Sequence, residues 1–470
     1  MSKLTISKIA NPNYLAKVFQ LTKLDPVPNA DRLLVTEVDF QPVLTNKDAV
    51  LNDWYVYFPT ESKILDNLLK HTNSYRDSVL NHDPLASGGY FEKNGRVKTV
   101  KMRGSYSSGF ILPLTKLESF IGNDIEKKEV YFDTVNDLVI VSKYIKPFEK
   151  KDQVAGLSKS DKKASKISVI PGQFQFHNDT ENLRRNSYKI KPETMIDVTY
   201  KYHGTSAIVG NVLYKKKPNW WQKVLKITPK PYYDYIWSSR KVIKTKSSVP
   251  GYYSQDIWTI LKEEIKEKIP KGFVVYGEIV GYLPDGGSIQ GKYDYGLKPG
   301  THAFYIYRIT SVNEDGYAVE LSTDDIIEFS KKVGLPYINK FYSGSAEDLF
   351  LRLVESNDTI DKEQFKDDLI SYKHYKVISE SCSDKDKEKN LALYDKYLSF
   401  FQENFVKLLE LNYNEKNCYI CKNKVPEEGI VIRLSGKLDK FEALKLKSFK
   451  FLEKESKDAD KEISNIEDEN

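Results

Sequence analysis

Residues 198–206 read VTYKYHGTS, a run of β-branched and aromatic residues that reaches Lys201 and is followed closely by Gly204. Such a run predicts a β-strand, and a glycine just after it predicts a turn. The stretch therefore places a lysine between a strand and a turn. By itself a pattern this short occurs often by chance, and its default interpretation is an exposed turn lysine.

Four further segments follow in order along the chain and narrow the interpretation. They are VYGEIVG at 275–281 with Glu278, FYIYRI at 304–309 with Tyr307, PEEGIVIR at 426–433 with Glu428, and LKLKSFKFLEKE at 444–455 with Lys445 and Lys447. Their order along the chain resembles the motif order of a known protein family, and a match of five ordered segments rarely arises by chance.

The five segments resemble motifs I, III, IIIa, IV and V of the covalent nucleotidyltransferases. The K-x-H-G form around Lys201 is similar to RNA ligases, whereas DNA ligases and capping enzymes usually show K-x-D-G. The resemblance implies an ATP-dependent RNA ligase in which Lys201 becomes covalently adenylylated. AMP then moves to an RNA 5′-phosphate, and a 3′-OH attacks that activated end to seal the strand. The implied cofactors are ATP and Mg²⁺ or Mn²⁺, and the implied partner is RNA with 5′-phosphate and 3′-OH ends, nicked duplexes included.

The resemblance also implies roles for individual residues. The expected catalytic residues are Lys201, Glu278, Glu428, Lys445 and Lys447. The expected nucleotide contacts are Tyr200, His203, Gly204, Glu278, Tyr307, Lys445 and Lys447, with Tyr307 stacking on the purine. The expected metal ligands are Glu428 and Glu278, and the expected RNA contacts are Ser206, Arg240, Lys101 and Arg103.

Elementary chemistry explains why this reaction needs these residue types. A lysine amine attacks phosphorus only when it is neutral, whereas the ordinary pKa of lysine is about 10.4. Partial burial, a bound divalent metal and the cations Lys445 and Lys447 all disfavour the ammonium form of Lys201. The same cations neutralise charge that builds on the phosphate oxygens. Carboxylate oxygens are the ligands that Mg²⁺ prefers, so Glu428 is expected to organise the metal.

Several motif residues have a structural interpretation beside the functional one. His203 serves equally well as a structural hydrogen-bonding group or as a site residue. Phe304 is expected in the core, since alternation along a strand sends Tyr305 to the other face. Tyr307 is preferred at the stacking position because it matches the stacking residue of the motif that the segment resembles. Arg308 stands where an aspartate often follows the stacking aromatic, which leaves its surroundings open. Glu427 is expected at the surface.

The amino-terminal region reads as short β-rich runs with turn residues between them. The expected strands are Val18–Leu24, Arg32–Val38, Trp54–Phe58, Val97–Met102 and Phe110–Leu114, which suggest a small barrel. Stretches 25–33, 54–58, 97–104 and 109–113 resemble the amino-terminal OB domain of one branch of RNA ligases. OB barrels bind nucleic acid through charged faces and aromatic stacking. Lys98, Lys101, Arg103 and Tyr106 are therefore candidate RNA contacts, although solvated strand charges explain them equally well.

The expected organisation is an α+β chain with an OB-fold domain at 1–125, a linker at 126–172, a nucleotidyltransferase domain at 173–455 and an acidic tail at 456–470. The linker contains eight lysines against three acids between Lys143 and Lys166. Mixed strands and helices predict an α+β domain after it. The expected strands are Ile196–Thr199, Phe273–Glu278, Ala303–Ile309 and Gly429–Leu434, and the expected helices are Asp256–Lys268 and Leu391–Leu411.

Composition sets only broad limits. The 470 residues favour two domains. The 40% hydrophobic and 29% charged fractions, the lack of a membrane-length apolar run and the start MSKLTISKIANPNY predict a cytoplasmic protein. Three cysteines fit a reducing compartment. The net charge of +6 leans only mildly toward polyanionic partners. We expect a monomer with no membrane partner.

Two further features are suggestive only. Residues 215–221, KKKPNWW, interleave cations with aromatics and could bind phosphates and bases or form a packed insertion. Cys418 and Cys421 form half of a possible zinc site, with Cys382 and His374 as further candidates, but one C-x-x-C pair is a weak signal. The remaining histidines, His71, His82, His177 and His302, show no metal-ligand spacing. No role is predicted for the segment from Lys331 to Asn417.

Two alternative functions remain open. A DNA ligase or a capping guanylyltransferase would share the lysine chemistry, but it would carry K-x-D-G and an OB module after motif V, where only 23 residues follow Lys447. A non-catalytic RNA-binding protein could contain a decayed nucleotidyltransferase fold. The presence of Lys201, Glu278, Glu428, Lys445 and Lys447 argues against decay.

Overall fold

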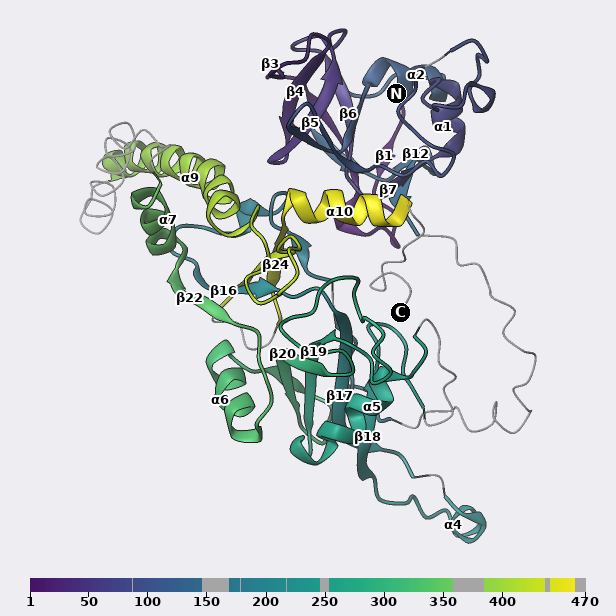
Figure 1. Ribbon diagram of the computed structural model, residues 1–470, viewed down its shortest axis with the longest axis vertical. Helices are drawn as coiled ribbons and strands as arrows, with labels where there is room; N and C mark the ends of the chain where they lie inside the picture. Colours follow the sequence, from purple (N-terminus) through teal and green to yellow (C-terminus); the bar gives the residue numbers. More distant parts are fainter. Residues whose placement is uncertain are drawn as a thin grey trace. The chain divides into compact units, whose positions relative to one another are not determined.

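The computed structural model describes residues 1–86, 88–145, 169–177, 179–216, 218–245, 253–357, 384–435 and 440–460. The chain divides into two compact units (Figure 1). The first unit contains Met1–Pro147, Glu181–Ser187 and Phe449–Ile463, and the second contains Phe148–Thr180, Tyr188–Ser448 and Ser464–Asn470. Both units combine helices with antiparallel strands, so the predicted α+β class is confirmed.

The first unit is built around an antiparallel sheet whose two faces are both covered. Its strands follow the order β10 (Phe110–Pro113), β6 (Trp54–Phe58), β2 (Ala16–Gln20) and β11 (Val130–Phe132). Even-numbered residues such as Val56 and Phe58 join one hydrophobic cluster, which also contains Leu68 and Leu117 from the helices α1 (Asp66–His71) and α2 (Leu114–Ile121). Odd-numbered residues such as Tyr55 and Tyr57 pack in a second cluster. The period of two along a strand produces this division.

The other strands of the first unit form small separate sheets. They are β3 (Asp25–Pro26) with β4 (Leu33–Val38) and β5 (Gln41–Asn46), the hairpin β8 (Thr99–Met102) with β9 (Ser105–Ser108), β7 (Ser62–Ile64) with β14 (Val141–Lys143), and β1 (Leu4–Thr5) with β12 (Thr134–Val135) and β13 (Leu138–Val139). Each of the five predicted strands has a counterpart, in β2, β4, β6, β8 and β10. Among the described residues these sheets are open, and a closed barrel is not formed by their hydrogen bonding.

The first unit extends beyond the residues expected for the amino-terminal domain. Residues 130–143, expected in the linker, form β11 to β14 because β11 pairs with β2 and β14 pairs with β7. Helix α10 (Phe449–Asp460), which spans the predicted start of the acidic tail, belongs to the same unit. Its buried Phe451 and Leu452 explain why it packs instead of fraying. The rest of the linker between 146 and 168, and the tail beyond 460, lie outside the described residues.

The second unit contains two antiparallel sheets. One includes β24 (Ala443–Lys447), β23 (Gly429–Leu434), β16 (Met195–Lys201) and β22 (Lys340–Ser345), in that order. The other has the order β18 (Tyr232–Ser238), β17 (Thr205–Tyr214), β19 (Phe273–Gly281), β20 (His302–Val312) and β21 (Ala318–Glu320). All four strands predicted for this region are confirmed, as β16, β19, β20 and β23.

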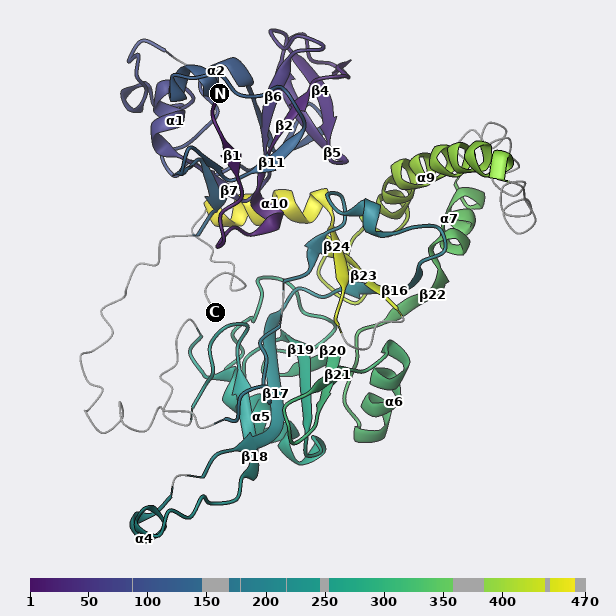
Figure 2. The ribbon, with the colours of Figure 1, turned by 180° about the vertical axis from the view of Figure 1, so that it is seen from behind.

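Helices cover the second sheet and extend the first. In α5 (Ile257–Ile265) the buried Ile257, Trp258, Leu261 and Ile265 recur at helical spacing and pack in the core cluster of the second sheet. Helix α6 (Thr323–Val333) begins with a capping box at Ser322 and ends at Gly334 in the left-handed conformation. Helices α7 (Ala346–Glu355) and α9 (Asp384–Tyr413) lie side by side (Figures 1 and 2). Both predicted helices are thus confirmed, in α5 with the short turn Lys266–Lys268, and in α9.

Candidate active site between the two sheets

Lys201 lies where the chain passes from one sheet of the second unit to the other. It is the last residue of β16, and β17 begins at Thr205 after three connecting residues. Gly204 approaches β19 so closely that a Cβ added to it would lie 2.2 Å from the backbone oxygen of Ile279. Only glycine fits this position without displacing backbone. The local sequence therefore holds Lys201 at the junction of the two sheets.

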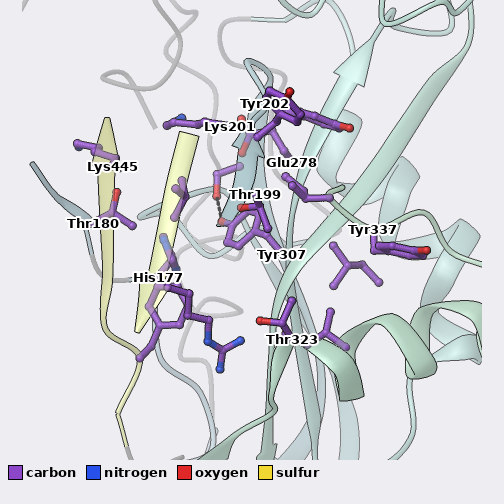
Figure 3. A pocket seen from close by; sticks show the side chains of 18 of the residues that line it. His177, Thr180, Thr199, Lys201, Tyr202, Glu278, Tyr307, Thr323, Tyr337 and Lys445 are labelled. Carbon is purple, nitrogen blue, oxygen red and sulfur yellow. Dashed lines mark hydrogen bonds between the residues drawn. The ribbon is translucent and has the colours of Figure 1, made fainter. Parts of the chain in front are cut away.

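A cavity lies between these sheets (Figure 3), with a polar end and a mainly apolar end that also contains Arg433, whose Nη2 donates to the carbonyl of Leu321. Lys201, Glu278 and Lys445 lie toward one end, and Thr323 and Tyr337 lie toward the other. The apolar lining is contributed by Ile306, Ile326, Ile327, Ile338 and Val431. A cavity that offers cations at one end and apolar side chains at the other suits a ligand with a phosphate group and a flat ring.

Strand register explains how distant lysines come together. Lys201 pairs with Gly429, which in turn pairs with Lys447. In the next row on the same face, Thr199 pairs with Val431, which pairs with Lys445. Residues two apart on a strand point to the same side, so the three lysines share one face of the sheet. Gly429 leaves the space between Lys201 and Lys447 without a side chain.

Glu428 provides the carboxylate beside these amines. Its Oε1 atom lies 2.8 Å from Nζ of Lys201 and 3.5 Å from Nζ of Lys447. The Glu428 side chain is fully buried, whereas that of Lys201 keeps 17% of its surface exposed. The Nδ1 atom of His203 lies 3.8 Å from the other oxygen of Glu428. One enclosed carboxylate is therefore close to three potential cations.

Lys445 has an unusually low proton affinity. Burial, followed by the positive charges of Lys447 and Arg240, lowers the pKa of Lys445 to about 8. An anionic ligand would offset each of these causes, because opposite charge favours the ammonium form. The amine of Lys445 is thus poised to bind an anion at the polar end of the cavity.

Glu278 and Tyr307 lie on neighbouring strands that face the cavity. Oε1 of Glu278 accepts a hydrogen bond of 3.2 Å from the backbone amide of Gly204. Tyr307 is the extra residue at a β-bulge, since Tyr276 pairs with Arg308 while Gly277 pairs with Ile306. Bulges re-aim side chains beside functional sites. The hydroxyl groups of Tyr307 and Ser206 lie 3.3 Å apart, and burial raises the pKa of Tyr307. The bulge turns the Tyr307 ring into the cavity (Figure 3).

Phe304, by contrast, packs in the core cluster that α5 covers, as expected for that position. Arg308, whose surroundings the sequence left open, forms a buried pair with Glu320. The ring of Tyr200 packs at 4.7 Å from Phe341 and 4.8 Å from Tyr419, although Tyr200 also borders the cavity. Arg240 lines the cavity and forms an ion pair with Asp179.

His203 is held in place by two tyrosines. Its backbone amide donates a hydrogen bond of 2.5 Å to the hydroxyl of Tyr295, and its ring lies edge-on to Tyr293 at 4.8 Å. His203 is 4% exposed and does not line the cavity, although its ring borders Glu428. Both predicted roles, structural and functional, are thus compatible with its position.

The expected surface position of Glu427 is wrong. Glu427 is only 3% exposed. Its backbone amide bonds to the carbonyl of Lys416, and its own carbonyl accepts from the Ser448 hydroxyl. Burial, followed by the nearby Cys418 and Glu428, raises the pKa of Glu427 to about 9. Glu427 and Glu428 directly precede β23, and both are buried, so neither carboxyl group is exposed to solvent.

Sequence reasoning missed several cavity residues that lie outside the five segments. His177 is in ring contact with Tyr307 at 5.2 Å, and burial, then Arg308 and Arg240, lowers the pKa of His177 to about 3. The ring is therefore neutral at pH 7 and serves as part of the apolar wall. Thr323, Tyr337 and Phe441 also line the cavity. No local sequence pattern indicates that these residues line the cavity, because only the packing of α6 and of the connections between strands places them beside it.

In the first unit the candidate RNA contacts divide into two groups. Lys98 is buried, and its Nζ lies 2.8 Å from Asp460 and 3.1 Å from Glu92, so Lys98 is a structural cation. Lys101 and Arg103 lie in the exposed β8–β9 hairpin. Nζ of Lys101 lies 4.7 Å from the centre of the Tyr106 ring. That ring also stacks on Phe449 at 5.8 Å.

The possible zinc site is incomplete within the described residues. Cys418 is buried and Cys421 half-buried, and both are free thiols. Cys382 and His374 lie outside the described residues. Within the described part of the chain, no group of three or more His, Cys, Asp or Glu side chains is arranged to hold a metal ion. In the same ranges, no helix carries the long apolar stretch that a membrane-crossing segment requires.

Comparison with known proteins places this site in a family. The family model described as RNA ligase matches residues 196–452, more than half of the 470 residues. The chain therefore belongs to the RNA ligase family. The matched residues run from β16 into α10 and include Lys201, Glu278, Glu428 and Lys445.

Solved structures of a Naegleria gruberi RNA ligase share the fold. A mutant in the apo state and a mutant with ATP and Mn each give a TM-score of 0.53 at 15% identity, over 94% of this chain and 98% of that chain. The same enzyme with PPi gives 0.51 at 16% identity, over 94% and 99%. Identity this low establishes a similar fold alone. None of the curated proteins compared with the chain matches it.

Proposed function

We propose that this protein is an ATP-dependent RNA ligase that acts through a covalent lysyl-AMP intermediate on Lys201. The observation that carries the proposal is the cavity in which the Lys201 amine lies beside Glu428 and Lys447, with Lys445 at the same polar end. Membership in the RNA ligase family supports the reaction class. The Naegleria gruberi structures with ATP, AMP and Mn support the cofactors.

In the first step, Nζ of Lys201 attacks the α-phosphorus of ATP. A P–N bond forms, the bond from that phosphorus to the bridging oxygen of pyrophosphate breaks, and the amine loses a proton. The amine must be neutral to react, but its contact with Glu428 favours the ammonium form. Glu428 must therefore be engaged by another cation before the attack. Lys447, which shares the same carboxylate oxygen, is one such cation.

Two buried carboxylates fit a hard divalent cation. Glu278 lines the polar end of the cavity, and Glu428 adjoins it through its contact with Lys201, so both offer oxygen ligands there. Mg²⁺ and Mn²⁺ commonly take one or two carboxylates and complete their shell with water and phosphate oxygens. A site with two protein carboxylates matches this coordination preference better than a site with three or more protein ligands. When bound, the cation would withdraw charge from the phosphate oxygens and from Glu428.

The remaining cavity residues fit the nucleotide. We assign the base to the apolar end beside Tyr307, whose ring the bulge directs into the cavity. Lys445 and Lys447 would bind phosphate oxygens, and Glu278 the ribose or the metal. The backbone amide of Gly204 holds Glu278 in place through a hydrogen bond, and the ring of His203 lies next to the Glu428 carboxylate. Tyr200 would act through its packing rather than by stacking on the base.

The later steps need RNA with a 5′-phosphate and a 3′-OH. AMP moves from Lys201 to the 5′-phosphate, and the 3′-OH then displaces AMP as the phosphodiester forms. Ser206 and Arg240, both at the cavity, would contact the RNA phosphate. We assign the first unit to an OB-type RNA-binding role, with Lys101 and Arg103 of the β8–β9 hairpin as contacts. The protein would act as a monomer in the cytoplasm, consistent with two free thiols among the described residues.

Detection of AMP on Lys201 tests the proposal directly. The intact protein is incubated with Mg²⁺ and either ATP or GTP, and the peptide that contains Lys201 is examined by mass spectrometry. We expect AMP on Lys201 and no GMP, because a capping guanylyltransferase alone would use GTP. Lys201→Ala should abolish AMP attachment, whereas the exposed control Lys298→Ala should leave it unchanged. Attachment at full level in Lys201→Ala would overturn the assignment.

A further inference from the structure

The connection between β17 and β18 ends in an ordered tip that the ligase reaction does not use. Asn219 and Gln222 cap the short helix α4 (Trp220–Val224) through reciprocal hydrogen bonds of 3.0 and 2.9 Å. The amide of Leu225 then bonds to the carbonyl of Trp221, and the amide of Ile227 bonds to that of Gln222. The backbone of the tip is therefore held by its own hydrogen bonds, and its side chains are displayed in a defined arrangement.

The tip exposes large apolar side chains in one place. The exposed fractions are 66% for Trp220, 65% for Trp221, 60% for Val224, 64% for Leu225 and 50% for Ile227. The two indole rings lie 4.4 Å apart, edge to face. Scattered exposed apolar residues are ordinary, but a contiguous group of this size marks an interaction surface. These side chains therefore do not form a packed insertion, which was one of the two alternatives for residues 215–221.

The charge around this apolar group has one sign. Residues 215–231 contain six lysines and no aspartate or glutamate. Lys215, Lys216, Lys226 and Lys230 are exposed. Figures 1 and 2 show α4 at the end of the β17–β18 hairpin, away from β16, β23 and β24. The tip can therefore bind a partner without covering Lys201.

We propose that this tip docks the protein on an anionic membrane surface, with the apolar side chains in the interface and the lysines among the lipid headgroups. Tryptophan favours the boundary between headgroups and acyl chains, and lysines near it are attracted by anionic lipids. A segment that lies in the interface needs apolar side chains on a cationic frame rather than a span of apolar residues.

The aliphatic side chains decide between a membrane and RNA. Single-stranded RNA stacks on aromatic rings and contacts cations, so it would use Trp220, Trp221 and the lysines. It offers nothing that would bury Val224, Leu225 and Ile227, each of which is at least 50% exposed. A lipid interface accommodates all five. The proposal is independent of the ligase chemistry, because no residue of the tip lines the cavity.

Vesicle binding by the full chain tests the proposal. The protein is sedimented with vesicles of phosphatidylcholine alone or with added phosphatidylserine. We expect binding only to the anionic vesicles, weakened by salt. Trp220→Ser with Trp221→Ser should reduce binding roughly tenfold or more. Lys226→Gln and Lys230→Gln should each reduce it roughly fivefold. Exposed Tyr188 and Tyr317 provide the matched control, and their replacement by serine should have no effect.

Fluorescence gives a second measurement. Trp237 and Trp258 are buried and Trp54 is partly buried, so a blue shift on addition of anionic vesicles that disappears in the double tryptophan variant would report on the exposed Trp220 and Trp221. AMP attachment to Lys201 in each variant verifies that the variant is folded. Failure of the unaltered protein to bind anionic vesicles would overturn the proposal. So would loss of RNA binding in the double tryptophan variant with vesicle binding unchanged, which would assign the tip to nucleic acid instead.

Discussion

Two ion pairs in the second unit differ in how firmly the cation is held. Arg308 binds Glu320 with several hydrogen bonds, from Nε at 3.0 and 3.1 Å and from Nη2 at 2.5 Å, and its guanidinium lies over the rings of Tyr276 and Phe441. Lys201 touches Glu428 through one amine at 2.8 Å, shares it with Lys447 and remains partly exposed.

The difference shows which pair can take part in chemistry. The planar guanidinium of Arg308 is held by several hydrogen bonds to Glu320, lies between aromatic rings and also contacts Nδ1 of His177 at 3.4 Å, so it is fixed in place. A lysine amine on a flexible stem can leave its carboxylate when another cation replaces it. We therefore expect the Arg308–Glu320 region to control stability and the Lys201–Glu428 region to control the reaction.

Among the changes that test this comparison, the largest expected effect is that of Glu428→Gln on AMP attachment. The amide keeps the shape but removes the charge that organises Lys201, Lys447 and the metal, so the single-turnover rate should fall about 100-fold or more. Urea unfolding should change little, since the exposed fraction of Lys201 lets its charge be solvated. An unchanged rate would contradict the functional assignment of this ion pair.

The same substitution at the other pair should act on stability instead. Glu320→Gln leaves the Arg308 charge buried without its partner, which typically costs about 3–5 kcal/mol of the free energy of unfolding. Urea or thermal unfolding measures this loss. At a temperature where the variant is folded, its rate of AMP attachment should stay within a few-fold of the original. A stable variant with a much lower rate would reverse the comparison.

The smallest expected effect is a change in the pH profile through Lys445. Its pKa of about 8 lies below the ordinary value, so the ammonium that binds phosphate is present below pH 8 and is lost as the pH rises above it. In Lys445→Arg the charge persists. We therefore compare the rate of AMP attachment in the original protein with that in Lys445→Arg, both at low ATP. The original rate divided by the variant rate should decline by about tenfold per pH unit above 8. A flat ratio would exclude the titration of Lys445 as the source of the pH dependence.

Much of the fold could be predicted from local pattern. The strands β16, β19, β20 and β23 and the helices α5 and α9 occupy the predicted ranges, because their apolar residues recur at the strand or helix period. The first unit extends past the expected end of the amino-terminal domain. Its last strands are very short, as in β12 and β13 with two residues each, and their pairing with β1 and with one another has no local signal.

The candidate site divides in the same way. The five segments contain Lys201, Glu278, Tyr307, Glu428 and Lys445, but His177 and the buried position of Glu427 depend on packing from elsewhere. Tyr307 was preferred on resemblance. Its direction into the cavity comes from a bulge that no local pattern in β20 reveals.

The sequence by itself determined which side chains are available for chemistry and on which short elements they lie, because motif order and strand period are local properties. Only the tertiary structure decided that Lys201 lies within 2.8 Å of Glu428. That contact depends on the antiparallel register of β16, β23 and β24, and pairing between strands far apart in the chain is set by packing and hydrogen bonding across the whole sheet.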